Sequence, residues 1–297
     1  MHFSIITPSF RQPDWLRLCL SSVADQALEP TGIHEMPRSE GPITVEHVVQ
    51  DACSGDAVRA VCAEFPSVRL FQEQDRGMYD AVNRGLRRTA GDVCAYLNCD
   101  EQYLPGTLLT VADFFTQHPQ IDVVFGDVVV VDEAGHYTCS RQVLTPRSFH
   151  TQTCQLNTLT AATFFRRKIL EHEDLYFDPT WTSVGDAVWM LTLLSRRIRM
   201  DVTKTYLSAF VDSETNLNLT AGSRREIRAL RMSAPRWAQT LSPVWVAAHR
   251  IRRLLNGHYR PRPFFYDIYT RLTPSRRVHF DVDKPTGQWL TRLRVKT

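Results

Sequence analysis

Short apolar, β-branched runs alternate with helical segments along most of the chain. The strand-like runs occupy residues 3–10, 43–50, 67–75, 92–98 and 121–132. Apolar side chains recur at helical spacing over residues 14–26, 52–65, 78–91, 105–119 and 187–197. Strands that alternate with helices of this length predict an α/β fold, with a mixed, mainly parallel sheet and helices on both faces.

Composition narrows the class of protein. The 297 residues are 43% hydrophobic and 23% charged, as in ordinary globular proteins. No apolar stretch approaches the roughly 18 residues that a membrane span needs, and the first ten residues do not resemble a secretory signal. We therefore expect a cytoplasmic protein, with the inner face of the cell membrane as an alternative location. The seven cysteines include no C-x-x-C pair, so free thiols are expected.

Charge divides the chain into two parts. Residues 1–219 hold 18 Lys and Arg against 28 Asp and Glu, whereas residues 220–297 hold 17 against 4. We predict one domain over residues 1–220 and a basic, amphipathic helical extension over residues 221–297. The extension carries no recognisable nucleic-acid motif, so nucleic acid is not an expected partner.

Two roles are open for the basic extension. It could contact an anionic membrane, with its apolar side chains in the lipid and its arginines among the headgroups. Alternatively, it packs on the acidic body or forms the interface of a homodimer. The side chains expected at a membrane are Trp237, Trp245, Ile251 and Leu254 with Arg250, Arg252 and Arg253.

Acidic residues follow the predicted strands. Asp51 follows the second strand, Asp75 the third, and Asp100 with Glu101 the fourth. The carboxyl ends of parallel strands share one edge of a sheet, so these carboxylates are expected to face one crevice. Carboxylate oxygens suit Mg²⁺ or Mn²⁺, which would leave positions open for substrate phosphates. The alternative is that each Asp caps a helix or closes a turn.

Residues 73–108, EQDRGMYDAVNRGLRRTAGDVCAYLNCDEQYLPGTL, resemble the central signature of family 2 glycosyltransferases of the GT-A fold. Other strings resemble family features in the family's order, from about residue 3 to 212. They are ITPSF, QDACSGD, FGDVVVVDEAG, TFFRR and VGDAVWMLTLL. The resemblance implies a GT-A-type domain that transfers a sugar from a nucleotide donor to an acceptor hydroxyl, with inversion and a divalent metal.

The resemblance also implies a donor site. The backbone of Thr7, Pro8 and Ser9 would lie beside the nucleotide, and Asp51 and Asp75 would bind its base, commonly uracil. A fixed carboxylate is a strong acceptor for the N–H of a pyrimidine edge.

The string NCDE departs from the family pattern at one position. Asp100 resembles the family carboxylate near the ribose and metal, and Glu101 takes the place usually held by a second Asp that ligates the metal. Glu101 keeps oxygen chemistry but is one methylene longer. The resemblance therefore implies Mn²⁺ or Mg²⁺ held by Glu101 and Asp100.

Asp186, in VGDAVW, resembles the family's general base. The alternative reading makes Asp186 the N-cap of the helix that follows, and the two roles are compatible. Asp80 and Asn83 lie one helical turn apart and would face the donor sugar, although Asp80 could instead cap the start of its helix.

These features predict an inverting glycosyltransferase that acts on a nucleotide-sugar, with a UDP-sugar favoured, and on a glycan or lipid-linked acceptor. The family setting is the synthesis of cell-surface polysaccharide or another glycoconjugate. The alternative is a catalytically inactive nucleotide- or carbohydrate-binding protein of the same fold. The sequence does not specify the sugar, the linkage or the oligomeric state.

Overall fold

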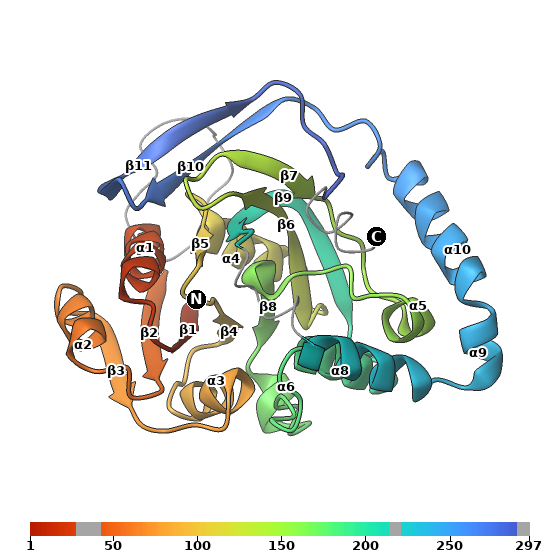
Figure 1. Ribbon diagram of the computed structural model, residues 1–297, viewed down its shortest axis with the longest axis horizontal. Helices are drawn as coiled ribbons and strands as arrows, with labels where there is room; N and C mark the ends of the chain where they lie inside the picture. Colours follow the sequence, from red (N-terminus) through yellow and green to blue (C-terminus); the bar gives the residue numbers. More distant parts are fainter. Residues whose placement is uncertain (28–42, 214–220, 290–297) are drawn as a thin grey trace.

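The computed structural model describes residues 1–27, 43–213 and 221–289 (Figure 1). The predicted domain boundary at residue 220 lies outside these ranges. The described part forms a central sheet with helices on both faces, a helical segment on one side and a separate hairpin above (Figure 1).

The central sheet has the strand order β3-β2-β1-β4-β8-β6-β9-β5, with β7 paired to β6, within the described residues. Strands β3, β2, β1 and β4 are parallel, β8 is antiparallel to both of its neighbours, and β6 and β9 are parallel. The strands are β1 (His2–Ser9), β2 (Thr44–Asp51), β3 (Val68–Gln72), β4 (Val93–Tyr96), β5 (Glu101–Tyr103), β6 (Val123–Val131), β7 (Tyr137–Arg141), β8 (Thr163–Arg166) and β9 (Met200–Val211).

Helices cover both faces of the sheet. Helices α1, α2 and α4 pack on one face, and α3, α6 and α7 pack on the other. This arrangement confirms the predicted α/β fold with a mixed, mainly parallel sheet and helices on both faces. The body helices are α1 (Pro13–Ala24), α2 (Asp56–Ala63), α3 (Met78–Arg87), α4 (Thr107–Gln117), α5 (Ser148–Thr153), α6 (Lys168–Glu171) and α7 (Gly185–Ser195), with 3₁₀ turns η1 (Asp25–Ala27) and η2 (Thr160–Ala162).

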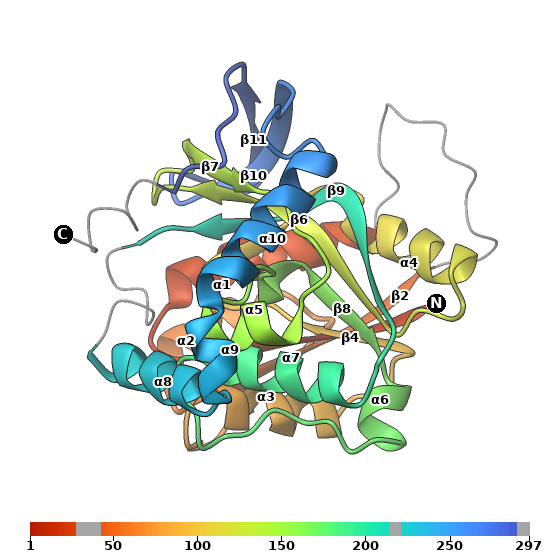
Figure 2. The ribbon, with the colours of Figure 1, turned by 90° about the vertical axis from the view of Figure 1, so that its right-hand side faces the viewer.

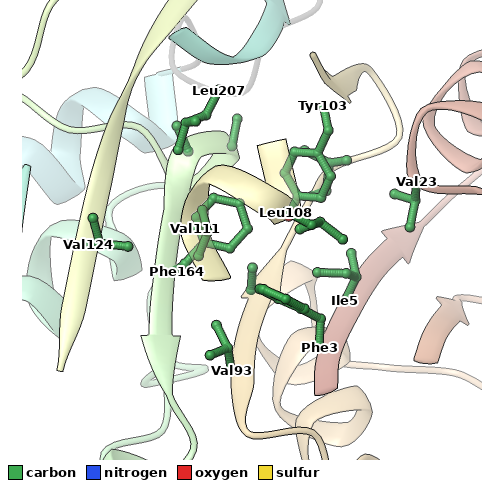
Figure 3. Packing of buried hydrophobic residues seen from close by; sticks show 14 of the residues in the cluster. Phe3, Ile5, Val23, Val93, Tyr103, Leu108, Val111, Val124, Phe164 and Leu207 are labelled. Atoms are coloured by element: carbon green, nitrogen blue, oxygen red, sulfur yellow. The ribbon is translucent and has the colours of Figure 1, made fainter. Parts of the chain in front are cut away.

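Strand β1 runs through the middle of the core. Its side chains alternate between the faces, so Phe3 and Ile5 pack beneath α1 and α4 while Ile6 packs against α3 (Figure 3). All three side chains are fully buried. A strand covered on both faces reads as a continuous apolar run, which is why residues 3–6 give a clear sequence signal.

The extension is helical only in its first part. Helices α8 (Ala221–Met232), α9 (Arg236–Thr240) and α10 (Ser242–Leu255) are followed by an antiparallel hairpin of β10 (Phe264–Thr270) and β11 (Thr273–Val282). The helical prediction is therefore wrong for residues 264–282. Tyr266, Ile268 and Val282 of the hairpin pack against apolar side chains of β6 and β9, and this burial stabilises the two hairpin strands. Figure 1 shows the hairpin above the central sheet.

Arg277 fastens the hairpin to the body. Its guanidinium donates to both carboxylate oxygens of Asp25, at 2.6 and 2.8 Å, and to the carbonyl oxygens of Tyr103 and Asp267 at 2.9 and 2.8 Å. A bidentate pair of an arginine and a carboxylate fixes the relative orientation of the two side chains as well as the distance between them.

Helix α10 lies across the outside of the molecule (Figure 2). One of its sides contacts the body and the other is exposed. On the inner side, Trp245 stacks on Phe149 with ring centroids 5.4 Å apart, and Arg252 donates to the carbonyl oxygen of Thr145 at 3.0 Å. Trp245 and Arg252 thus face the body, which agrees for these two side chains with the alternative that the extension packs on the body rather than with a membrane contact. Ile251, on the outer side, is 57% exposed.

No helix among the described residues is both long enough and apolar enough to cross a lipid bilayer.

Candidate active site

A cavity of about 1370 Å³ opens beyond the carboxyl ends of the parallel strands. Its lining includes Pro8 and Ser9 from the end of β1, Asp75 after β3, the pair Asp100 and Glu101 after β4, and Asp186 from α7. The fold thus brings together residues from four separate segments, at the position where α/β sheets bind ligands. The cavity is large enough for a molecule of nucleotide-sugar size.

Asp75 is one of the residues that line this cavity. One of its carboxylate oxygens accepts a hydrogen bond of 3.0 Å from the backbone N–H of Gly77. Burial raises the pKa of the Asp75 carboxyl, and the nearby Asp80 carboxylate acts in the same direction. Asp75 therefore presents an oriented acceptor to the cavity that Pro8 and Ser9 also line.

Thr7 and Asp51 do not line the cavity. The hydroxyl of Thr7 is buried against the ring of His47, with 2.8 Å between oxygen and Nε2. The buried Asp51 carboxylate accepts from the backbone N–H and hydroxyl of Ser54, at 2.8 and 2.6 Å, and from the amide of Gln72 at 3.2 Å. For Asp51, the turn-closing alternative accounts for the contacts observed.

Asp100 and Glu101 both face the cavity. Glu101 is 1% exposed, and one of its carboxylate oxygens accepts a 2.8 Å hydrogen bond from the backbone N–H of Asn98. Burial raises the pKa of the Asp100 carboxyl. Burial and the charge of Asp100 together raise the pKa of Glu101 to about 8.

The donor set at this pair fits a hard divalent cation, because both side chains supply carboxylate oxygens. No cluster of three or more His, Cys, Asp or Glu side chains suited to a metal occurs in residues 1–27, 43–213 and 221–289. Mg²⁺ commonly takes one or two carboxylates and completes its shell with water and substrate phosphates, so two protein ligands are compatible with such a site.

Asp186 is the second residue of α7, and Val184 is the N-cap. The alternative reading of Asp186 as the N-cap is therefore wrong, although its carboxylate still lies in the first turn and accepts from the N–H of Ala187 at 2.8 Å. The hydroxyl of the buried Tyr79 donates to the same carboxylate at 3.4 Å and accepts from the Asp186 N–H at 3.1 Å. The helix start and Tyr79 thus orient Asp186 at the cavity wall.

Asp80 and Asn83 do not line the cavity. The Asp80 carboxylate accepts from the backbone N–H of Arg76 at 3.0 Å and from the guanidinium of Arg84 at 2.9 Å. The amide of Asn83 donates to the carbonyl oxygen of Phe177 at 2.7 Å and accepts from the Phe177 N–H at 3.0 Å. Both side chains are engaged within the protein, and their predicted contact with a donor sugar remains untested.

The cavity has a further wall that sequence reasoning did not identify. Arg224, Ile227 and Arg231 of α8 line it, as do Arg141 and Trp289. Positions 224, 227 and 231 recur at helical spacing, so the sequence carried a signal that these side chains share one helix face. The contact of that face with the cavity depends on tertiary structure. The extension therefore forms part of the site.

The family model for glycosyl transferase family 2 matches residues 4–173, which is more than half of the chain. Over 131 residues the chain is 32% identical to a "PGL/p-HBAD biosynthesis glycosyltransferase" of Mycobacterium bovis, covering 43% of this chain and 47% of that protein. Over 102 residues it is 34% identical to an "Uncharacterized glycosyltransferase" of Mycobacterium tuberculosis, covering 34% of each. The chain thus spans about half the length, or less, of these curated relatives.

Among solved structures, S. aureus TarS residues 1–349 in complex with UDP superimposes with a TM-score of 0.56. That alignment covers 87% of this chain and 75% of TarS 1–349, at 18% sequence identity. The complex of the same TarS fragment with UDP-GlcNAc gives a TM-score of 0.57. This likeness shows a shared fold, and the family match over residues 4–173 shows that the chain belongs to glycosyl transferase family 2.

Proposed function

We propose that this protein transfers a sugar, with inversion, from a nucleotide-sugar donor to an acceptor hydroxyl. The observation that carries the proposal is the single cavity in which Asp75, the Asp100–Glu101 pair and Asp186 meet. The reaction needs a hydrogen-bond acceptor for the nucleotide's base, an anionic site for a metal and an acceptor for the proton. We assign these roles to Asp75, to the Asp100–Glu101 pair and to Asp186, in that order. Membership of glycosyl transferase family 2 supports the same reaction class.

The donor's nucleotide is assigned to the side of the cavity formed by Pro8, Ser9 and Asp75. The Asp75 carboxylate suits the N–H of a pyrimidine base, and charge-assisted hydrogen bonds are stronger than neutral ones. UDP is the first nucleotide to test, since TarS, which shares the fold, was solved with UDP. Asp100 is assigned to the ribose side, beside the diphosphate.

Asp186 acts as the general base in this proposal. Its carboxylate takes the proton of the acceptor hydroxyl as the oxygen attacks the anomeric carbon. The new C–O bond forms as the bond from the anomeric carbon to the phosphate oxygen breaks, and that electron pair leaves with the nucleoside diphosphate. One in-line displacement of this kind inverts the anomeric configuration.

Asp100 and Glu101 are the residues that would hold a divalent cation, Mn²⁺ or Mg²⁺. When bound, such an ion supplies positive charge at the diphosphate. Their contribution is to place two oxygen ligands at the cavity wall, with Glu101 fixed by its hydrogen bond from Asn98.

The exposed side of the C-terminal extension suggests the class of acceptor and the location of the enzyme. Trp237, Ile251 and Leu254 are 52%, 57% and 64% exposed, and no acidic residue occurs between Glu226 and Asp267. Exposed apolar side chains among arginines suit an anionic lipid surface. We therefore favour a glycan or lipid-linked acceptor and a cytoplasmic enzyme at the inner membrane face. The name of the M. bovis relative likewise indicates glycoconjugate synthesis.

The donor site is tested by thermal stabilisation. UDP, GDP, dTDP and CMP are added with and without Mn²⁺ to the wild type and to the double variant Asp100→Ala, Glu101→Ala. Ligands that bind the native state raise its melting temperature by mass action, so no acceptor is needed. A shift for one nucleotide that requires Mn²⁺ and disappears in the double variant supports the proposal. No shift with any nucleotide refutes the donor site.

Turnover separates an enzyme from a binding protein. The matching nucleotide-sugars are incubated with the wild type and with Asp186→Asn, and release of nucleoside diphosphate is measured with and without glycan or lipid-linked acceptors. Turnover that Asp186→Asn abolishes supports the proposed base. Nucleotide binding with no turnover of any donor favours the inactive binding protein instead.

A further inference from the structure

Glu226, on the second turn of α8, holds the segment that leads into α7. One of its carboxylate oxygens accepts from the backbone N–H and the hydroxyl of Thr182, at 2.8 and 2.7 Å. The other accepts from the backbone N–H groups of Ser183 and Val184, at 2.8 and 3.2 Å. A single side chain from the extension therefore binds four donors, 42 to 44 residues earlier in the chain.

Three of these donors are backbone N–H groups that lead into α7: those of Thr182 and Ser183 precede the helix, and that of Val184 belongs to its N-cap. The first N–H groups of a helix have no partner within the helix, so another group must satisfy them. The side chain of Val184, the N-cap, cannot accept a hydrogen bond, and Glu226 supplies a carboxylate from outside the helix. A negative charge at this end is also favoured by the helix dipole.

The pKa of Glu226 agrees with these contacts. Burial raises the pKa of this carboxyl, but the hydrogen bonds from Thr182, Ser183 and Val184 outweigh burial and lower it below the ordinary value of 4.5. The carboxylate is therefore ionised at neutral pH and accepts from all four donors.

The clamped segment ends two residues before Asp186, the proposed base. Asp186 is held from one side by Tyr79 of α3 and from the other by the path of residues 182–184. Ser183, Val184 and Asp186 all line the cavity, as do Arg224 and Ile227 on either side of Glu226 in α8. The same contacts thus set the position of the base and of the cavity wall contributed by α8.

We infer that Glu226 is a positioning residue for Asp186, which couples the C-terminal extension to the catalytic helix. Glu226 is not among the residues that line the cavity, and it acts through the backbone of residues 182–184. The inference rests on the proposed role of Asp186 as the base, and it adds a residue that lies outside the segment matched by the family model.

The first test is Glu226→Gln, because the side chains have the same shape and the amide nitrogen cannot accept from Ser183 and Val184. Amide hydrogen exchange is measured with and without UDP. We expect faster exchange at Ser183, Val184 and Asp186 in Glu226→Gln. Glu171→Gln, an exposed change on α6, is the matched control and should leave exchange at these amides unchanged.

Kinetics give the second readout. For the donor identified above, Glu226→Gln is expected to lower kcat by about 10- to 100-fold, the order expected from a small misplacement of a catalytic group. The KM for the donor should stay within about twofold, because Glu226 does not line the nucleotide side. Glu226→Asp, which keeps the charge, should recover part of kcat. Thr182→Val removes one of the four contacts and should lower kcat less, which provides a milder variant if Glu226→Gln does not fold.

Two results would overturn the inference. One is unchanged exchange at the Asp186 amide in a folded Glu226→Gln protein, and the other is increased exchange with an unchanged kcat. Failure of the proposed function is a different observation, namely a wild type that turns over no nucleotide-sugar. Amide exchange is measured without turnover and still decides whether Glu226 holds Asp186.

Discussion

Replacing Asn83 by Ala should destabilise the protein without weakening nucleotide binding. Asn83 is 3% exposed, and its amide makes hydrogen bonds of 2.7 and 3.0 Å to both backbone groups of Phe177, which is itself 2% exposed. The variant leaves a buried N–H and a buried C=O without their partner. At roughly 1–3 kcal/mol for each unsatisfied group, with some relaxation, the expected loss is about 2–4 kcal/mol.

The assay is urea denaturation followed by circular dichroism, together with a UDP titration and the KM for the nucleotide-sugar donor. Asn256→Ala is the matched control, because Asn256 is exposed and bonds only to a carbonyl oxygen of its own helix. Its effect should lie within about 0.5 kcal/mol. If Asn83→Ala keeps its free energy of unfolding but raises the KM for the donor, the side chain contacts the sugar as the family resemblance implies, and our reading of its contacts is wrong.

Three further substitutions test the supports of the site and the hairpin. In Gly185→Ala, the new Cβ would lie 2.5 Å from a ring carbon of Tyr79, so we expect a loss of about 1–3 kcal/mol in urea denaturation. Because the pKa of Glu226 is lowered in the folded state, its contribution to stability is complete above the ordinary glutamate value and disappears as the pH falls through the lowered one. Glu226→Gln should therefore flatten the decline of melting temperature below about pH 5. Arg277→Leu should cost about 3 kcal/mol, because the Asp25 carboxylate loses its guanidinium partner and keeps only neutral donors such as the hydroxyl of Tyr269. Limited proteolysis should then cut the hairpin first.

The strands of the parallel half were predictable because burial on both faces leaves a strong local signal. Residues 3–6 and 93–96 are fully buried or nearly so, and an apolar run of this kind is visible in the sequence alone. The hairpin at residues 264–282 was missed although Tyr266, Ile268 and Thr270 alternate as strand residues do. The arginine-rich helical pattern that precedes residue 264 led us to predict helix for the residues that follow it as well.

The site was predictable where it depends on strand ends and less so where it depends on contacts distant in sequence. Asp75, Asp100, Glu101 and Asp186 line one cavity, as expected from their places after strands or at a helix start. Nothing local to Glu226 indicates that its carboxylate binds residues 182–184, 42 to 44 positions away. Such a contact becomes visible only when the fold brings the two segments together.

The cavity wall is built from residues as far apart in the sequence as Pro8 and Trp289, and this affects when the wall can be complete. During synthesis on the ribosome, a chain that has emerged as far as α7 already carries Asp100, Glu101 and Asp186. It still lacks the wall formed by α8 and the segment that ends at Trp289. Chains emerge from the amino terminus, so the wall that α8 and Trp289 supply is added after the carboxylates are in place. Partly made or proteolytically clipped chains would keep the carboxylates but leave them open to water.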